Sequence, residues 1–185
     1  MGRKNIGIFV GSLREAAFSK SVAEYIEKQS SASFQYETVE IGDLPLYNQD
    51  YDDKGTAPVA YEKFRAAVKP LDGVLFVTPE YNRSVPAVLK NALDVGSRPY
   101  GQSVWDGKPG GVISLSPGNI GGFGSNHHLR QSLVFLNVPV LQQPEAYLAH
   151  IAGGIGDDGK IQDPKLKQLL TDFLKAYEAW VNKIV

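Results

Sequence analysis

DGVLFVTPEYNRSVP, residues 72–86, begins with a continuous apolar run and ends in a loop that two prolines stiffen. The run over residues 72–78 is rich in β-branched and aromatic side chains, which predicts a strand buried on both faces of a sheet. After the loop, Val88, Leu89 and Leu93 recur at helical spacing. A strand, a loop and a helix in this order are typical of one unit of a parallel α/β sheet.

The same order of elements repeats towards both ends of the chain. The predicted strands cover residues 6–10, 34–41, 72–78, 108–116 and 138–141. The predicted helices cover residues 20–29, 58–68, 85–95 and 126–136, with a closing amphipathic helix from residue 164. Residues 44–52 contain Pro, Asn and Asp and are predicted to form a loop. The alternation predicts an α/β fold: a doubly wound five-stranded parallel sheet with helices on both faces.

The composition predicts one globular domain over residues 1–185, with 43% hydrophobic and 21% charged side chains. The formal net charge is -1 and Lys and Arg form no run, so neither nucleic acid nor a membrane is an expected partner. The sequence has no cysteine, which excludes disulfides, thiolate metal sites and dithiol redox chemistry. A redox function therefore requires a bound cofactor. The N-terminal apolar run is too short for a signal peptide, so we expect a cytoplasmic location.

Ligands of doubly wound sheets bind at the carboxyl ends of the strands, where the strand order reverses. Three loops are therefore candidates: residues 11–19, 79–84 and 116–124. The first reads GSLREAAFS and places hydroxyls at Ser12 and Ser19, together with Arg14, before a helix. This combination suits an anion such as phosphate, because the N–H groups that open a helix attract anions. The alternative is that Ser19 only caps the helix and Arg14 is solvated.

The second and third loops offer groups that suit a flat ligand. The second provides backbone amides, Glu80, Asn82 and the aromatic ring of Tyr81, which can hold a polar heterocycle. The alternative is that its Asn and Ser side chains cap the next helix and Tyr81 covers the core. The third, SPGNIGGFG, has four glycines that let the backbone approach a ligand closely or adopt positive φ. Such turns before helices are common, so the third loop alone indicates little.

Two other patterns are set aside as functional sites. Gly154, Gly156 and Gly159 match G-x-G-x-x-G, and GDDGK resembles part of a P-loop. The two aspartates would repel phosphates and too little chain follows for another βαβ unit, so a hairpin-like turn is predicted. The adjacent His127 and His128 point in different directions on a helix, which predicts surface residues and no metal site.

The three loops, taken with their flanking segments, carry a family resemblance. The matching stretches are GSLR with Phe18 and Ser19, LPLYNQD, TPEYN followed by SVPAVLKNALD, GKPGGVISLSPGNIGG, and HLRQSLVFL. Together they extend over about residues 6–146 in the same order. In these stretches the chain resembles the NAD(P)H-dependent FMN reductase family, most closely its quinone and chromate reductase branch.

The resemblance implies a flavodoxin-like fold with FMN as cofactor. In the first loop the implied phosphate contacts are Ser12, Arg14 and Ser19 with neighbouring backbone amides, and Leu13 and Phe18 are further implied cofactor-binding residues. In the second loop the implied contacts to the isoalloxazine and ribityl groups are Pro79, Glu80, Tyr81, Asn82 and Arg83. In the third loop, Ser116, Pro117 and Gly118 are expected at the other edge of the ring. Relatives often have Ser-Phe-Asn where this chain has Ala17-Phe18-Ser19, so the phosphate contacts differ at this point.

The resemblance also implies an oxidoreductase that takes electrons from NADPH or NADH and passes them to a small acceptor, such as a quinone or chromate, by ping-pong hydride transfer. The cofactor carries this chemistry, so no catalytic acid or base is expected. One alternative is a flavodoxin-type electron carrier without nicotinamide turnover, although such carriers tend to be strongly acidic. Another is a relative of the same fold that binds no flavin and acts as a nucleotide-binding or scaffold module.

Assembly into a homodimer or homotetramer is a further implication of the resemblance. The helices predicted over residues 85–95 and 126–136 would then contact a partner, with the flavin pocket near the interface. Residues 44–51 and Arg98, Pro99 and Tyr100 are plausible contributors to a neighbouring site. The apolar faces of the two helices could equally cover the chain's own sheet.

Overall fold

Within residues 2–185, which the computed structural model describes, five parallel strands form one sheet in the order β2-β1-β3-β4-β5. The strands are β1 (Lys4–Val10), β2 (Phe34–Thr38), β3 (Gly73–Pro79), β4 (Gly110–Leu115) and β5 (Ala146–Leu148). The chain moves from β1 outwards to β2 and then crosses back to β3, so the strand order reverses between β1 and β3. The predicted doubly wound five-stranded sheet is confirmed.

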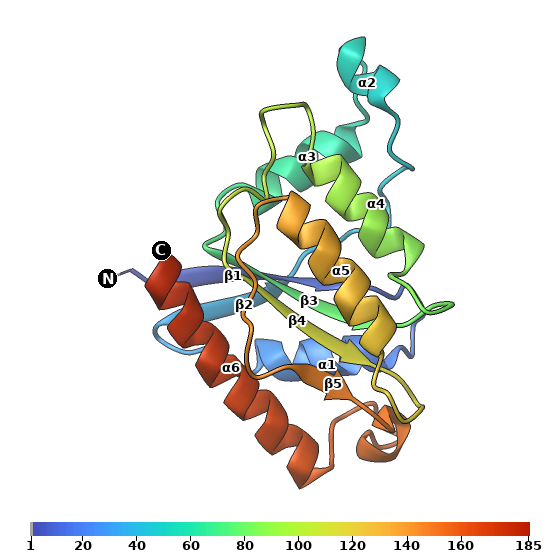
Figure 1. The fold of residues 1–185 in the computed structure, drawn as a ribbon, viewed down its shortest axis with the longest axis vertical. Helices are drawn as coiled ribbons and strands as arrows, with labels where there is room; N and C mark the ends of the chain where they lie inside the picture. Colours follow the sequence, from blue (N-terminus) through green and yellow to red (C-terminus); the bar gives the residue numbers. More distant parts are fainter. Residues whose placement is uncertain (1) are drawn as a thin grey trace.

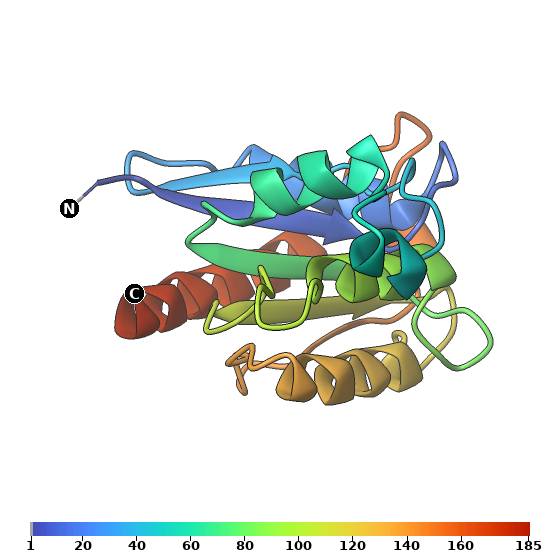
Figure 2. The same cartoon turned by 90° about the horizontal axis from the view of Figure 1, so that it is seen from above.

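Helices cover both faces of this sheet (Figure 1). The helices are α1 (Phe18–Glu27), α2 (Gln49–Asp53), α3 (Val59–Val68), α4 (Ala87–Gly96), α5 (Phe123–Phe135) and α6 (Pro164–Ile184), with a short 3-10 helix, η1 (Ile151–Gly154). Helices α1 and α6 pack on one face, and α3, α4 and α5 pack on the other. Figure 2 shows the strands ending at a common side of the molecule, where several of the connecting loops gather.

Strand β3 shows why the sheet is held between two layers. Leu75 and Val77 pack with α1 and α6, while Val74 and Phe76 pack with α3, α4 and α5. All four side chains are fully buried, as the period of two in a strand requires when both faces are covered. The continuous apolar run that predicted this strand therefore reflects burial on both sides.

Strand β2 forms one edge of the sheet, and side chains near the end of α1 occupy its outward backbone groups. The N–H of Tyr36 donates to Oγ of Ser30 at 3.0 Å, and the N–H of Thr38 donates to Oε1 of Glu27 at 2.8 Å. The inward N–H groups of this segment pair with β1, as Val39 N does with Ile8 O at 2.9 Å.

The prediction of the fifth strand was wrong. Residues 138–141 run beside β4 only through a single bridge between Gly110 and Val140, and β5 begins at Ala146. Pro139 has no N–H to donate, so this run cannot continue a regular ladder. The apolar side chains of the run instead fill the core next to β4, where Val138 and Val140 pack with α5.

The prediction of a loop over residues 44–52 was also partly wrong, because α2 forms within it. The side chain of Asn48 accepts a hydrogen bond from Asp50 N and caps this five-residue helix. Asp52 makes a bidentate ion pair with Arg65 of α3, at 2.8 and 2.9 Å, which attaches the segment to the domain. Tertiary contacts therefore stabilise a helix that the local sequence does not predict.

The turn predicted near Gly159 is confirmed. Ile155 and Ile161 form an antiparallel bridge, Gly156 N donates to Lys160 O at 3.0 Å, and Gly159 has a φ of +73°. Separately, none of the helices formed by residues 2–185 is both long and apolar enough to cross a membrane.

Candidate functional site

The three candidate loops follow β1, β3 and β4, which are neighbours in the sheet. Gly11 N donates to Val77 O at 2.9 Å, which holds the start of the first loop against the end of β3. A Cβ atom at Gly11 would lie 3.0 Å from Cδ of Pro79, so the two chains approach each other closely here. The loops predicted to form one site do lie side by side.

The first loop contains both buried and exposed side chains. Ser12 is 4% exposed, whereas Leu13 and Arg14 are exposed, with the Arg14 guanidinium 5.6 Å from the centre of the Phe18 ring. Ser19 is fully buried, and its hydroxyl has no hydrogen-bond partner in the part of the chain that the structure describes. A buried hydroxyl without a partner is costly, which makes it a marker for a missing ligand.

The capping role considered for Ser19 is wrong. Helix α1 begins at Phe18, and the capping position is Ala17, whose side chain cannot accept a hydrogen bond. Ser19 therefore lies inside the first turn. Lys20 N donates to Ala17 O at 2.9 Å, whereas the first N–H groups of the helix, those of Phe18 and Ser19, precede any intrahelical acceptor and suit an anion.

The second loop is a tight hairpin. Tyr81 and Ser84 exchange backbone hydrogen bonds of 3.1 and 3.0 Å, and the two residues between them, Asn82 and Arg83, have φ values of +50° and +65°. Positive φ at both central positions is typical of a type I′ turn. Tyr81 is 49% exposed and Asn82 and Arg83 are exposed, so their side chains are accessible to a ligand.

The alternative roles of this loop are not supported. Helix α4 begins at Ala87 after Pro86, so Asn82 and Ser84 do not cap it. The exposure of Tyr81 shows that its ring does not simply cover the core.

Glu80 lies in the second loop as predicted, but its carboxylate contacts the protein. The Glu80 side chain is only 9% exposed; it accepts a hydrogen bond from Ser125 N at 3.1 Å and pairs with Arg83 at 3.3 Å. A carboxylate at the N-terminus of α5 is stabilised by the helix dipole. Glu80 thus connects the second loop to the start of α5, and its carboxylate does not project from the loop like the Tyr81 side chain.

We expect Glu80→Ala to destabilise the protein by about 1–2 kcal/mol, because α5 loses its N-terminal acceptor and Arg83 loses its partner. Urea unfolding followed by circular dichroism measures this loss. Glu15→Ala, which removes an exposed carboxylate from the first loop, is the control and should change the unfolding free energy by less than about 0.5 kcal/mol. Equal stabilities of the two variants would contradict the structural role of Glu80.

The third loop leads into α5 through two glycines with positive φ, Gly121 at +56° and Gly122 at +77°. Helix α5 begins at Phe123, three residues before the predicted start. Ser116 is half-buried and donates its hydroxyl hydrogen to Gly118 O at 3.3 Å, while Pro117 and Gly118 are exposed. These three residues thus remain available to a ligand on the side opposite the first loop.

The sequence patterns did not predict the buried polar residues that connect the loops to the sheet. Ser125 Oγ lies 3.0 Å from Thr78 Oγ1, and Asn126 Nδ2 donates to Ser114 Oγ at 3.2 Å. Both contacts join the start of α5 to the carboxyl end of a strand. The available signal was a hydroxyl residue at the end of each apolar strand, Thr78 in β3 and Ser114 in β4.

An aromatic cluster borders the third loop. The rings of Phe123 and His127 lie 4.3 Å apart, and Tyr147 lies 5.5 Å from Phe123 and hydrogen-bonds His127 at 2.9 Å. Burial raises the pKa of Tyr147 to about 12, with a further contribution from Glu145, so the phenol stays neutral at physiological pH. His127 and His128 are both exposed, as predicted.

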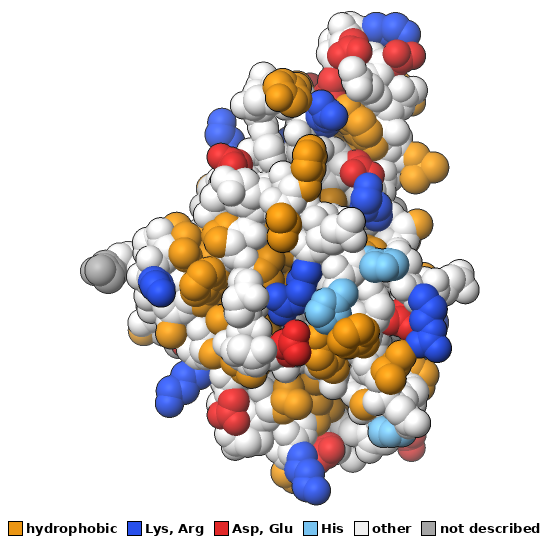
Figure 3. All heavy atoms as spheres, viewed as in Figure 1, with side chains coloured by type: hydrophobic (Ala, Val, Ile, Leu, Met, Phe, Trp, Pro, Cys, Tyr) orange, Lys and Arg blue, Asp and Glu red, His pale blue; other side chains and the backbone are white. Residues whose placement is uncertain are grey.

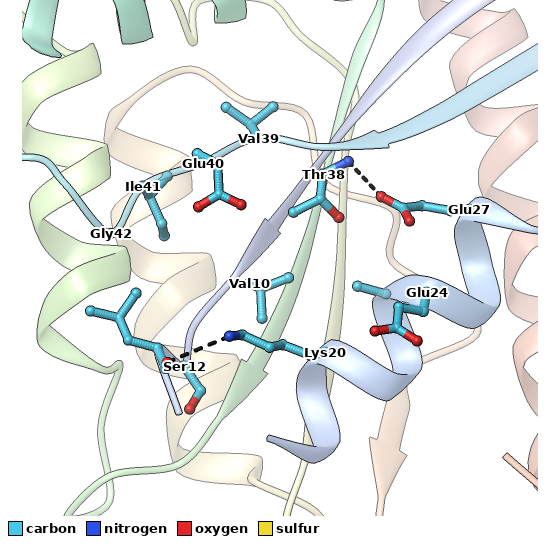
Figure 4. Close-up of a pocket in the computed structure, with 12 residues that line it drawn as sticks. Val10, Ser12, Lys20, Glu24, Glu27, Thr38, Val39, Glu40, Ile41 and Gly42 are labelled. Atoms are coloured by element: carbon cyan, nitrogen blue, oxygen red, sulfur yellow. Dashed lines mark hydrogen bonds between the residues drawn. The ribbon is translucent and has the colours of Figure 1, made fainter. Parts of the chain in front are cut away.

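A cavity of about 290 Å³ lies beside the first loop, between α1 and the residues that follow β2 (Figure 4). Glu24, Glu27 and Glu40 line it, and Lys20 donates to Leu13 O at 3.5 Å. This carboxylate-rich cavity does not suit a phosphate. Across residues 2–185, no group of three or more His, Cys, Asp and Glu side chains could hold a metal ion.

The residues of the three loops fit a phosphorylated flat cofactor. The first loop combines the hydroxyl of Ser19, which has no partner within residues 2–185, with Ser12, Arg14 and the N-terminus of α1, all of which can donate to an anion. Glu80, a carboxylate that would oppose an anion, is bound to Ser125 N instead. The second and third loops add exposed backbone and an aromatic residue, Tyr81.

Fold and site together define a flavodoxin-like α/β protein. The family model of NADPH-dependent FMN reductase matches residues 4–153, and the chain belongs to this family. It is therefore an oxidoreductase that uses FMN as cofactor and NAD(P)H as electron donor, so the predicted enzyme class is confirmed and the carrier and scaffold alternatives are not supported.

Individual relatives agree with this assignment. A quinone reductase of Pseudomonas putida is 51% identical over 178 residues, covering 96% of this chain and 95% of the relative. A 2-hydroxy-1,4-benzoquinone reductase of Burkholderia is 44% identical over 177 residues, covering 96% of both chains. Among solved structures, FerB, a flavoenzyme NAD(P)H:(acceptor) oxidoreductase of Paracoccus denitrificans, has a TM-score of 0.90 and 35% identity, covering 98% of both chains.

Proposed function

We propose that the three loops hold FMN, with Ser12, Leu13, Arg14, Phe18 and Ser19 at its phosphate. Pro79, Glu80, Tyr81, Asn82 and Arg83 contact the ring and ribityl groups in this assignment, and Ser116, Pro117 and Gly118 lie at the opposite edge. The observation that carries the proposal is the buried hydroxyl of Ser19, which lacks a partner among the described residues, in the first turn of a helix whose first residue, Phe18, lies beneath the Arg14 guanidinium. Glu80 contacts the cofactor through its backbone in this assignment, because its carboxylate already accepts a hydrogen bond from Ser125 N.

The protein's own part in catalysis is to bind and orient. When bound, the isoalloxazine supplies the two-electron redox chemistry. The first loop anchors the anionic end through a guanidinium and hydroxyls, and the hairpin at residues 81–84 presents backbone N–H and C=O groups in a fixed geometry. No residue in this assignment transfers a proton as an acid or base. We propose that residues 1–185 act as a single FMN-binding domain.

For the acceptor we propose a quinone, because relatives that align over nearly the full chain are quinone reductases. Chromate is a second proposed acceptor. A cytoplasmic compartment is the proposed location, since NADPH and NADH are supplied there.

Anaerobic mixing tests this activity. We expect NADPH or NADH to bleach the yellow flavin absorbance of the purified protein, and addition of 1,4-benzoquinone to restore it. Chromate is tested in the same way as a second acceptor. Flavin that is bleached but not restored by the quinone would reject the acceptor assignment, and a colourless protein that takes up no FMN would reject the proposed site.

We further propose that the outer face of α4 and α5 binds a second copy of the chain. A groove of about 580 Å³ runs between these helices, lined by Leu93, Phe135 and Leu136 among others. Phe135 is 90% exposed and Val134 is 76% exposed. Figure 3, which views this face, shows apolar side chains at the surface over both helices. The groove is also lined by polar and charged side chains, among them Lys90, Asp94 and Arg98. Large exposed apolar side chains beside a groove of this mixed character favour a protein interface, and a homotetramer would add a second interface.

Phe135→Asp is expected to convert the dimer to a monomer, because a charge would be buried without a partner at the interface. Sedimentation velocity at micromolar concentration measures the change in mass. Val59→Asp is the matched control: Val59 is an exposed apolar residue in the first turn of α3, where a carboxylate is favourable. A Phe135→Asp variant that sediments like the wild type would reject this interface.

A further inference from the structure

The hydroxyl of Tyr81 lies 3.0 Å from Oγ of Ser12, a contact that joins the hairpin after β3 to the loop after β1. Ser12 is almost fully buried, so its hydroxyl has few alternative partners. Tyr81 occupies the first position of the hairpin at residues 81–84, which its own backbone hydrogen bonds to Ser84 close. The turn therefore fixes the position of Tyr81.

The directions of the hydrogen bonds around Ser12 are restricted. A serine hydroxyl has one proton and two acceptor lone pairs. The backbone N–H of Arg14 can only donate, and it lies 3.4 Å from Ser12 Oγ, so it uses one lone pair. When the Tyr81 hydroxyl also donates, both lone pairs are occupied and the Ser12 proton is left for an acceptor outside the protein.

A phosphate monoester selects this arrangement. Its ionised oxygens only accept hydrogen bonds, so Ser12 must donate to them, and Tyr81 must then donate to Ser12. Hydrogen bonds in such a chain polarise one another, which strengthens the bond to the anion. Riboflavin has no phosphate and gains nothing from the arrangement.

We propose that Tyr81 is a positioning residue that lets the site distinguish FMN from riboflavin, by donating its phenol proton to Ser12 and committing the Ser12 hydroxyl to the phosphate. This inference rests on the proposed binding of the FMN phosphate by the first loop. It refines the contact with the ring and ribityl groups proposed above for Tyr81, because it assigns the Tyr81 hydroxyl to the phosphate end of the cofactor.

The test measures the affinity of the flavin-free, full-length chain for FMN and for riboflavin, by quenching of flavin fluorescence. The proteins are the wild type, Tyr81→Phe, Ser12→Ala and the double variant. Tyr25→Phe, which removes a phenol hydroxyl from α1, is the matched control. Circular dichroism checks that each variant is folded.

We expect Tyr81→Phe to weaken FMN binding by about two- to tenfold, the range for one hydrogen bond, and to leave riboflavin binding unchanged. Ser12→Ala should weaken FMN binding at least as much, and the double variant should lose less than the product of the two single losses, because the residues act through one chain of hydrogen bonds. Tyr25→Phe should bind both flavins like the wild type.

Three results would overturn the inference. Equal losses for FMN and riboflavin in Tyr81→Phe would place the role of Tyr81 at the ring. Unchanged FMN binding in Tyr81→Phe, with a loss in Ser12→Ala, would reject the role of Tyr81 alone. Unchanged FMN binding in Ser12→Ala would reject the phosphate contact as well, and with it the proposed assignment of Ser12.

Discussion

Gly121→Ala is expected to lower the free energy of unfolding by roughly 3 kcal/mol or more and to abolish FMN binding. Gly121 has a φ of +56°, and a Cβ atom there would lie 2.6 Å from the carbonyl carbon of Tyr147 and 2.9 Å from its oxygen. These atoms belong to the backbone of β5, which cannot move without disturbing the sheet. Ser114 Oγ also donates to Gly121 O at 2.9 Å, and a shift of the loop would break this bond.

Thermal and urea unfolding, together with FMN titration, measure both effects. Gly118→Ala in the same loop is the matched control, because a Cβ atom there would lie 3.8 Å from the nearest atom, Ser116 Oγ, an ordinary contact. The free energy of unfolding of Gly118→Ala should stay within about 1 kcal/mol of the wild-type value. If Gly121→Ala matches Gly118→Ala in unfolding free energy and in FMN binding, the backbone of the third loop can adjust to a Cβ atom at residue 121.

Arg14→Ala is expected to weaken FMN binding by about ten- to hundredfold, the loss for a charge-assisted hydrogen bond of about 1.5–3 kcal/mol. The Arg14 guanidinium is exposed and lies over the Phe18 ring, so its removal should change the stability of the flavin-free protein little. Fluorescence titration with FMN measures the affinity.

Riboflavin and a second arginine provide the controls for Arg14. Riboflavin binding should be unaffected by Arg14→Ala, because the lost contact is to the phosphate. Arg3→Ala removes an exposed arginine from the residue before β1, at the opposite end of the strand from the loop, and should leave FMN binding intact. If FMN affinity is unchanged in Arg14→Ala, the guanidinium does not bind the phosphate.

The fold was predictable because its main signals are local. The apolar run over residues 72–78 predicted β3 to within one residue at each end, since a strand buried on both faces has no polar alternation to confuse it. The prediction of the fifth strand failed because an apolar run can be buried without forming a strand. The apolar residues 138–141 are buried without joining the sheet as a strand, and only the missing N–H of Pro139 distinguishes the two cases.

The site was predictable at the level of loops and less so at the level of side chains. The strand order predicted that three loops would meet, but the orientation of a side chain depends on its tertiary neighbours. Glu80 illustrates this, because its carboxylate is taken by Ser125 N, a group 45 residues later in the chain. Helix α2 is a similar case, since the ion pair of Asp52 with Arg65 connects two segments that local patterns treat separately.

The occupied N–H groups of β2 reduce the tendency of the chain to aggregate with other unfolded or partly folded proteins. An open edge strand is a template on which a foreign extended segment can add, the first step towards amyloid-like growth. Here Ser30 and Glu27 already hold the outward donors of Tyr36 and Thr38. A newly made chain that has folded α1 onto β2 is thereby protected against strand addition at this edge of the sheet.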